Sequence, residues 1–343
     1  MNKTTIALVI SSVYCFIATA QNKPYKAAEV YTASQYQYGK IEVRMLAAKG
    51  SGIISNFFTF KNGSEKANTF WEEIDIEIFG KDGSNAWQSN SISGQGNLNL
   101  TRIEGVHQQS NLADNYNTYS IEWKPSSVTW KVNDVKIREV INGQANDIDD
   151  PASLRFNIWN PNIPEWVGSF DNNILPVHMF VNWIKFYDWN GSEFSSTPQW
   201  VDNFNSFDTN FWIKANHTFN ENQSDFIPPN ATVKNGYLVL SITKQNKTGY
   251  NGTPPVDIND NEPTLDLNQF SRASAKDIIK IEYNSTQRIA TIYGMSDDFK
   301  YTIHSLDGKK IITGNGATIK LDTISNGTYI LVSDAFSKKF VVN

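Results

Sequence analysis

A chain of 343 residues is long enough for one large domain or for two modest ones. Its formal net charge of −5 and its 19% of charged residues suit a soluble protein and provide no polybasic surface, so we expect no nucleic-acid partner. The ten tryptophans all lie between Trp71 and Trp212. They fit a large core, and because tryptophan also stacks on the apolar faces of sugar rings they mildly favour a carbohydrate site.

The N-terminus has the pattern of an export signal. Lys3 precedes an apolar run from Ile6 to Ile17, and Ala18-Thr19-Ala20 forms a small-residue cleavage site. The run is too short to span a bilayer, and no other segment is apolar enough to do so. We therefore expect residues 1–20 to be removed and the protein to be secreted or displayed on a bacterial cell surface. The single cysteine, Cys15, would leave with the signal, which excludes disulfides, thiol nucleophiles and cysteine-ligated zinc.

Short alternating runs separated by Gly, Asn, Asp and Ser fill the region from about residue 28 to 188. Lys40–Met45 alternates between polar and apolar residues, and so does Val128–Val132, which ends at an Asn133-Asp134 turn. No stretch has a convincing helical period of 3.6 residues. We therefore predict an all-β fold, an antiparallel β-sandwich.

Composition divides the chain into a main domain, a linker and a small C-terminal domain. A second β-rich stretch, Phe204–Thr243, extends the main domain, which we expect over residues 21–244. Residues 245–275 are polar and contain a Pro254-Pro255 pair, as is typical of a linker. Strand-like runs return in residues 276–343, which is enough for a separate β-domain.

The segment from Trp71 to Gly80 carries acidic residues at three alternating positions, Glu73, Asp75 and Glu77. Positions i, i+2 and i+4 of a strand share one face, so these carboxylates point one way and the intervening isoleucines point into a core. Carboxylates aligned in this way repel one another, and stability alone would not favour them. Such a cost indicates a function.

Crowding of the three acids also indicates which chemistry they perform. One negative carboxylate raises the pKa of its neighbour, so one glutamate can stay ionised as a nucleophile while the other keeps a proton for a leaving oxygen. Asp75, between them, can hold a hydrogen bond that tunes both. A solvated acidic strand face and calcium binding by the carboxylates remain the alternatives at this point.

The sequence Trp-Glu-Glu-Ile-Asp-Ile-Glu resembles the active-site strand of glycoside hydrolase family 16, a jelly-roll sandwich whose concave sheet holds a glucan. The resemblance covers roughly residues 26–244 and includes Tyr38–Met45, Asn56–Phe60, Leu154–Trp159 and Trp183–Tyr187. It implies Glu73 as the nucleophile, Asp75 as its assistant and Glu77 as the general acid/base.

The spacing within this strand resembles one branch of the family. Laminarinases, agarases and carrageenases usually carry one more residue before the last glutamate, as a bulge, whereas licheninases and plant xyloglucan transferases do not. The Cys-rich extension of the plant enzymes is absent, so the resemblance implies a licheninase that cuts mixed-linkage β-1,3-1,4-glucan. Asp202–Leu240 resembles strands that open most licheninases but follow the catalytic strand here, as in circularly permuted members. A β-1,3-glucanase and a non-catalytic glycan-binding protein remain alternatives.

The expected substrate contacts combine strand alternation with the resemblance. Alternation puts Arg155, Asn157 and Trp159 on one face of a strand, where polar residues in a sandwich need a reason. The resemblance implies that these three contact the substrate together with Phe58, Phe60, Asn62, Glu65, Gln88 and Trp166. Ordinary core packing is an equally good interpretation of Phe58 and Trp166. Phe60 stands where the permuted members have tyrosine, and His217 stands where they have tryptophan.

We expect catalysis to need no cofactor. A structural calcium site implied by the resemblance would fall on Asn182, Asn203 and Gly236, whose oxygen ligands suit calcium, although the same residues suit plain turns equally well.

The C-terminal domain resembles a type IX secretion sorting domain, on the segments His304–Lys310, Ser325–Val332 and Lys338–Phe340. The expected partners are therefore the polysaccharide substrate and the type IX secretion machinery, and we expect a monomer. A carbohydrate-binding module is the alternative, but this region has no tryptophan to stack on sugar.

Overall fold

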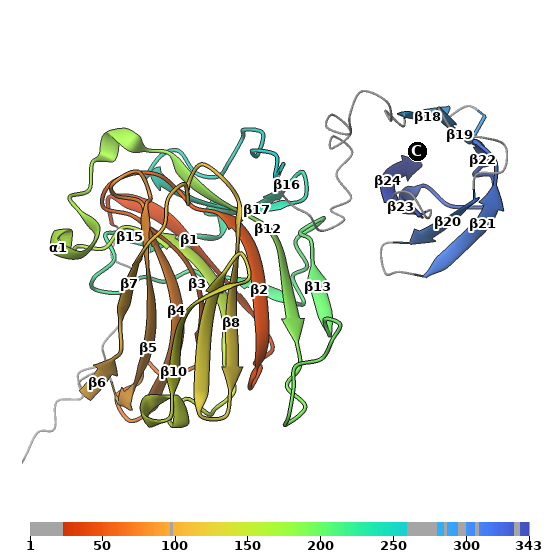
Figure 1. Cartoon of the computed structure of the whole chain (residues 1–343). Helices are drawn as coiled ribbons and strands as arrows, with labels where there is room; N and C mark the ends of the chain where they lie inside the picture. The colour runs from red at the N-terminus through yellow and green to blue at the C-terminus, as the bar shows by residue number, and fades with distance from the viewer. Residues whose placement is uncertain are drawn as a thin grey trace, which may run out of the picture. The chain divides into compact units, whose positions relative to one another are not determined.

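The computed structural model forms two compact units, one ending at Val256 and one beginning at Asp257 (Figure 1). The described residues are 23–96, 99–258, 280–284, 287–293, 300–305, 309–332 and 337–342. The expected signal at residues 1–20 and most of the expected linker lie outside them. Within these described ranges, no helix has the length and apolarity needed to cross a membrane.

The first unit contains two antiparallel sheets, which we call sheets I and II. Sheet I contains, in spatial order, β6 (Asn99–Arg102) and β7 (Gly105–Gln108) on one edge of β5 (Ala86–Gln95), then β4 (Phe70–Phe79), β3 (Ile54–Phe60), β11 (Ser153–Trp159), β1 (Tyr25–Thr32) and β14 (Trp212–Lys214). The strands from β3 to β7 pair with near neighbours in the chain, whereas β11 pairs with β3 and β1, and β1 with β14, through non-local connections, so residues far apart in sequence meet on one surface.

Sheet II forms the second layer of the sandwich. It contains, in order, β10 (Val135–Ile141), β9 (Ser127–Val132), β8 (Asn117–Lys124), β2 (Gly39–Leu46), β12 (Val177–Tyr187), β17 (Tyr237–Lys244) and β16 (Ala231–Lys234). β13 (Trp200–Asp202) also pairs with β12, and β15 (Ser224–Phe226) pairs with the start of β1. The few helical turns are α1 (Pro164–Val167), η1 (Gly143–Asn146), η2 (Asn172–Ile174) and η3 (Pro228–Asn230).

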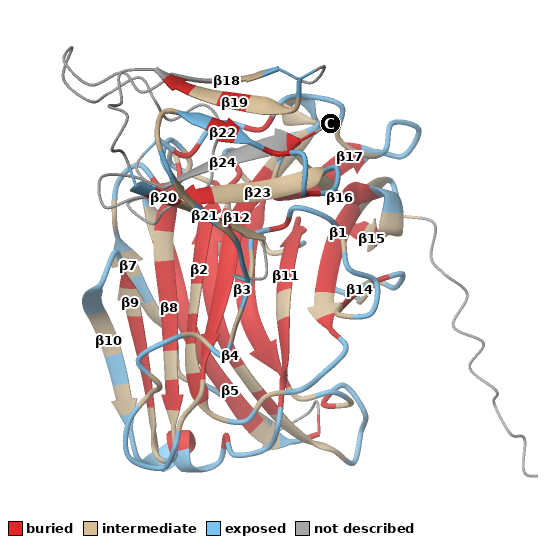
Figure 2. Cartoon of the chain, turned by 90° about the vertical axis from the view of Figure 1, so that its right-hand side faces the viewer, coloured by how far each residue is buried: buried red, intermediate tan, exposed pale blue. Residues whose placement is uncertain are grey.

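The core between the sheets follows from strand alternation. Ile74, Ile76 and Ile78 of β4 are completely buried, as are Phe57 and Phe156 on neighbouring strands. Figure 2 shows the strands of this unit as mainly buried, with exposed residues concentrated in the loops. A two-sheet arrangement of this kind buries one apolar face of each sheet and leaves the other face of sheet I available for polar residues. The predicted all-β sandwich is confirmed.

Residues 245–256 pack on the first unit, although their polar composition indicated a linker starting at 245. The backbone N–H of Gly249 donates to Oδ1 of Asn230 at 2.8 Å. The Tyr250 ring lies 4.6 Å from the ring of His178, and Tyr116 donates its hydroxyl to the carbonyl of Pro255 at 3.0 Å. A few anchoring side chains therefore hold a segment whose average composition is polar.

The second unit contains two small sheets. One consists of β18 (Lys280–Asn284), β19 (Ile289–Tyr293) and β22 (Thr318–Lys320). The other has the order β21 (Lys310–Asn315), β20 (Lys300–Ser305), β23 (Gly327–Val332) and β24 (Ser337–Val342). Ile292, Ile303, Ile319 and Leu331 are among its buried core residues.

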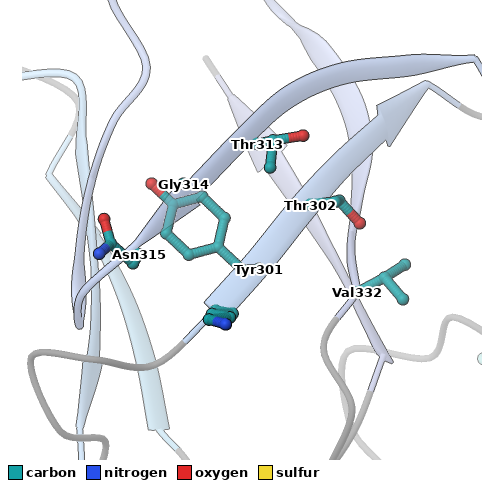
Figure 3. A pocket seen from close by; sticks show the side chains of 7 residues that line it. Tyr301, Thr302, Thr313, Gly314, Asn315 and Val332 are labelled. Carbon is teal, nitrogen blue, oxygen red and sulfur yellow. The ribbon is translucent and has the colours of Figure 1, made fainter.

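One face of this second unit has a hollow of about 390 Å³ beside β20 and β21 (Figure 3). The Tyr301 ring lies over Gly314 there, since a Cβ atom on Gly314 would come within 2.5 Å of the tyrosine hydroxyl. Because Gly314 has no side chain, the Tyr301 ring can occupy this space. The hollow is lined by Lys300, Tyr301, Thr302, Thr313, Gly314, Asn315 and Val332.

Candidate active site

The three acidic residues of β4 lie on the surface of sheet I that faces away from the core. β4 pairs in continuous register with β3 on one side and β5 on the other, so its alternation is unbroken. Asp75 and Glu77 are only 4% and 8% exposed, whereas Glu73 is more accessible. The sequence-based assignment of these carboxylates to one face agrees with this register.

Glu73 is held by a tryptophan on its own strand. Trp71 donates its indole N–H to Oε2 of Glu73 at 2.7 Å. Burial raises the pKa of Glu73 to about 7, while the Trp71 hydrogen bond and the positive charge of Arg155 oppose that rise. Trp71 stands two residues before Glu73, so strand alternation alone could have placed it in the site.

Glu77 is held from the neighbouring strand β5. Gln88, its direct cross-strand partner, donates Nε2–H to Oε2 of Glu77 at 2.8 Å. Burial, followed by the negative charge of Glu73, raises the pKa of Glu77 to about 8, while the Gln88 hydrogen bond opposes that rise. Of the two glutamates, Glu77 therefore keeps its proton to the higher pH.

Asp75 lies between the two glutamates. Burial, followed by the charges of Glu73 and Glu77, raises its pKa well above the usual range, and it shares a hydrogen bond with Glu73. The hydrogen bond with Glu73 also raises the pKa of Asp75, because the protonated form of Asp75 is the donor. On the backbone of the same residue, the carbonyl accepts the indole N–H of Trp130 at 2.9 Å, which fixes this part of β4 to the core.

A polar cluster continues the site across β11 and β1. Arg155 forms an ion pair with Glu29 at 2.9 Å, and Asn157 donates to the other oxygen of Glu29 at 3.1 Å. Arg155 also donates to Oδ1 of Asn62 at 2.8 Å and to the hydroxyl of Ser153 at 2.8 Å. Arg155, Asn157 and Asn62, expected in the site from the sequence, are thus joined in one network.

Glu29 is a second site residue, besides Trp71, that the sequence reasoning missed. It is 4% exposed and pairs across the strands with Asn157. A charged residue inside the otherwise apolar run of β1 was the available signal, since a buried carboxylate requires partners.

The expected aromatic contacts form two groups. Phe58 is the cross-strand neighbour of both Asp75 and Arg155, and the Phe60 ring lies edge-on to Trp71 at 5.3 Å and 4.5 Å from the Arg155 guanidinium. Trp159 and Trp166 lie with their ring centroids 6.1 Å apart, on β11 and α1. Phe58 and Phe60 therefore lie on the same face as the carboxylates, and the two tryptophans lie at the C-terminal end of β11.

Two further sequence-predicted positions lie in loops. Glu65 is exposed in the connection between β3 and β4, the same loop that carries Asn62. His217 is also exposed, and its ring lies edge-on to Phe226 at 5.4 Å. An imidazole at this position offers a smaller apolar face than the indole of the permuted members.

The expected calcium residues meet at one junction of sheet II. Asn182 lies on β12 between the stretch paired with β17 and the stretch paired with β13. Asn203 follows β13, and Gly236 is in the β16–β17 turn, where a Cβ would lie 4.0 Å from the Asn203 carbonyl oxygen. The nearby oxygen atoms fit a hard cation in chemical type.

The chain is similar to several known proteins. Residues 3–185 match the model of "Glycosyl hydrolases family 16". The chain is 37% identical over 268 residues to a beta-glucanase of Fibrobacter succinogenes, a match that covers 75% of this chain and 76% of that protein. It is 33% identical over 168 residues to a beta-glucanase of Bacillus subtilis, covering 49% of this chain and 65% of that one.

Among solved structures, a beta-glucanase of Bacillus licheniformis is 32% identical, with a TM-score of 0.38 over 45% of this chain and 68% of that one. The family match covers more than half of this chain, and the Fibrobacter match covers three quarters of it. This chain belongs to glycosyl hydrolases family 16.

Proposed function

We propose that the protein is a retaining endo-β-glucanase in which Glu73 is the nucleophile and Glu77 the general acid/base. The observation that carries this proposal is the pair of glutamates on one strand face: Glu73 accepts from Trp71 and is favoured in its ionised form by Arg155, whereas the negative charge of Glu73 raises the pKa of Glu77. The group that ionises first is suited to attack, and the group that keeps its proton is suited to protonate a leaving group.

In the first step, a Glu73 carboxylate oxygen attacks the anomeric carbon while Glu77 protonates the departing glycosidic oxygen. In the second, Glu77, now ionised, removes a proton from water, which displaces Glu73 and restores both groups. The proton of Asp75 hydrogen-bonds to Glu73 and lowers the negative charge that Glu73 presents to Glu77. Arg155, through its positive charge, favours the ionised form of Glu73.

The substrate we propose is mixed-linkage β-1,3-1,4-glucan, cut at β-1,4 bonds that follow a β-1,3 linkage. The continuous register of β4 supports this choice, because the resemblance associates regular spacing with licheninases and a bulge with laminarinases. The Fibrobacter relative is named a beta-glucanase. We further propose a circularly permuted order, in which β13–β17 correspond to strands that open the chain in most licheninases.

Product analysis on a panel of polysaccharides tests this assignment. Barley β-glucan and lichenan should yield short oligosaccharides with a β-1,3 linkage near the reducing end, whereas laminarin, carboxymethyl-cellulose and xyloglucan should be nearly untouched. Preferential cleavage of laminarin would replace the proposal with a β-1,3-glucanase. Binding to glucans without any hydrolysis would replace it with a glycan-binding protein.

Four accompanying proposals come from the sequence: an export signal, a sorting domain, an extracellular monomer and a structural calcium site. Residues 1–20 direct export, the second unit is a sorting domain for type IX secretion, and the mature protein acts outside the cell as a monomer. Oxygen atoms of Asn182, Asn203 and Gly236 would hold a structural calcium ion, which would join β12 to the loops beside it. Thermal unfolding in EDTA and then in calcium chloride tests the ion, because a resident calcium should raise the Tm.

A further inference from the structure

β6 and β7 pair one after the other with the same side of β5, and together they form one edge of sheet I. Arg102 is opposite Ile92 and Val106 is opposite Gln88. Between them, Ile103 exchanges two backbone hydrogen bonds with Ser91, at 2.9 and 3.3 Å. The register therefore continues through the short gap, and it puts Glu104 opposite Asn90, which is itself the cross-strand partner of Asp75.

The two faces of this edge can be told apart by their contacts. The His107 ring lies 4.6 Å from the ring of Trp87, a core residue, and a Cβ on Gly105 would lie 2.9 Å from the guanidinium of Arg138. The odd-numbered residues of this edge, Ile103, Gly105 and His107, thus face the interior. Arg102 and Glu104, both exposed, share the other face with Gln88 and the catalytic carboxylates.

Few charged groups face Glu77. On its own strand these are Glu73 and Asp75. Its direct cross-strand neighbours are neutral: Asn56 on β3 and Gln88 on β5. Beyond them, Arg155 and Glu29 are paired with each other on β11 and β1, and among the described residues the other charges that act on Glu77 are Arg102 and Glu104 on the β6–β7 edge.

Both edge charges act on the acidic residues in the expected directions. The positive charge of Arg102 lowers the pKa of Glu77 and of Asp75, and the negative charge of Glu104 raises the pKa of Glu77. Two strand spacings separate this edge from β4, or roughly 10 Å, which is about one Debye length at 0.1 M salt. Interactions over this distance are modest and depend on ionic strength.

We propose that Arg102 and Glu104 are positioning residues that act through space on Glu77 and adjust the upper pH limit of the hydrolytic reaction. This proposal rests on the proposed role of Glu77 as general acid/base. The two residues act in opposite directions, so their separate removal should move the same limit in opposite directions.

The test uses the full mature chain with Arg102→Gln, Glu104→Gln and the double variant. At low salt, the alkaline limb of the pH profile of kcat/KM on lichenan should move to higher pH by about 0.3 units in Arg102→Gln. It should move to lower pH by a similar amount in Glu104→Gln. That shift corresponds to about a twofold change in activity on the limb. Both shifts should fade in 0.5 M sodium chloride.

Lys136→Gln serves as the matched control, because Lys136 is an exposed charge on β10 of sheet II and pairs with Glu139 at 3.0 Å. It should leave the limb unchanged. If neither edge variant moves the limb at low salt, or if both move it in the same direction, the proposal is wrong.

A direct titration separates this proposal from the assignment of Glu77. With ¹³Cδ-labelled glutamate, the Glu77 signal, identified by its loss in Glu77→Gln, should titrate higher in Arg102→Gln and lower in Glu104→Gln. Shifted titration with no effect on the kinetic limb would contradict the role of Glu77 and leave the electrostatic coupling intact. An unshifted titration would overturn the coupling itself.

Discussion

Gln88 and Glu77 face each other across β5 and β4, and the Gln88 side chain donates to the Glu77 carboxylate at 2.8 Å. A donor to the ionised form lowers the pKa of a carboxyl group, and it also fixes which oxygen atom remains free to carry the proton. Gln88 therefore links the position of Glu77 to its acidity.

Removing this donor should raise the pKa of Glu77 and loosen its position. In Gln88→Met we expect the alkaline limb of kcat/KM to move to higher pH, because Glu77 keeps its proton longer, and kcat to fall about tenfold because the carboxyl group is less well oriented. Gln95→Met, at the exposed end of the same strand, is the control and should have the normal profile. An unmoved limb in Gln88→Met would argue against Glu77 as the proton donor.

The roles of Glu73 and Glu77 can be separated by chemical rescue. With an activated aryl β-glycoside, Glu77→Ala should recover rate in azide and give a glycosyl azide of retained configuration, because the nucleophile is intact. Glu73→Ala should give the inverted azide, because azide then attacks the substrate directly. Product NMR distinguishes the two, and exchanged outcomes would reverse the assignments.

Glu72 provides a close control for these variants. Its carboxylate faces away from the site, contacts Lys61 at 2.8 Å and accepts the backbone N–H groups of Asp149 and Asp150, both at 2.8 Å. Glu72→Ala should therefore lower the stability of the fold, and azide should not change its rate or its product.

The contrast between Glu72 and Glu73 shows which features of the site the sequence could predict. Alternation in β4 predicted which acids share a face, because a core of isoleucines fixes the phase of a strand. It could not predict that Glu29 pairs with Arg155, since β1 and β11 are adjacent only through non-local pairing. Nor could composition predict that residues 245–256 pack on the sandwich, because three or four anchoring contacts suffice in an otherwise polar segment.

The Glu29–Arg155 pair should affect both acidity and stability. Glu29 raises the pKa of Glu73 and Arg155 lowers it. Glu29→Gln should thus move the acid limb of kcat/KM to lower pH, and Arg155→Met should move it to higher pH. Arg155→Met should also cost about 3 kcal/mol in unfolding free energy, because it leaves the 4%-exposed Glu29 as a buried unpaired charge.

A double variant checks the coupling between these two residues. Glu29→Gln combined with Arg155→Met removes both charges, so it should be more stable than Arg155→Met alone. Denaturant unfolding of the four proteins at pH 7 measures the coupling. Purely additive free energies would show that the ion pair contributes no interaction of its own.

The acidic site should reduce stability at alkaline pH. The pKa of Glu77 is raised from 4.5 to about 8 in the folded protein, so the folded state binds more protons than the unfolded state between these values. Stability therefore falls as pH rises through this window. Glu77→Gln, which stays neutral, should be more stable than the parent by about 4 kcal/mol at pH 8 and similar to it at pH 4.

Urea unfolding of the parent and of Glu77→Gln at the two pH values measures this difference. Glu122→Gln is the control, since Glu122 lies on sheet II and pairs with Lys131. An equal gain at pH 4 and pH 8 would mean that packing, rather than ionisation, stabilises the Glu77 variant.

The last prediction concerns where the catalytic unit ends. The sequence favoured an end at residue 244, but Asn230, fully buried, donates to Lys26, Ser241 and Thr243 through Nδ2 and accepts from Gly249 through Oδ1. A chain ending at Thr248 loses that N–H donor and leaves Oδ1 unpaired in the interior. It also loses the Tyr250 ring contacts with His178 and Phe180.

A chain ending at Ile258 keeps all these contacts and should unfold at the same denaturant concentration as the first unit of the full protein. The chain ending at Thr248 should be less stable by about 2–4 kcal/mol, since it combines a buried unpaired acceptor with lost aromatic packing. Tyr250→Ala in the longer chain should reproduce only the packing part of that loss. Both truncated chains, while folded, should hydrolyse lichenan at the normal rate, because the catalytic carboxylates and Arg155 lie on sheet I. Equal stability of the two truncations would mean that residues 249–258 do not contribute to the folded unit, and a loss of activity in the chain ending at Ile258 would give the second unit a part in binding glucan.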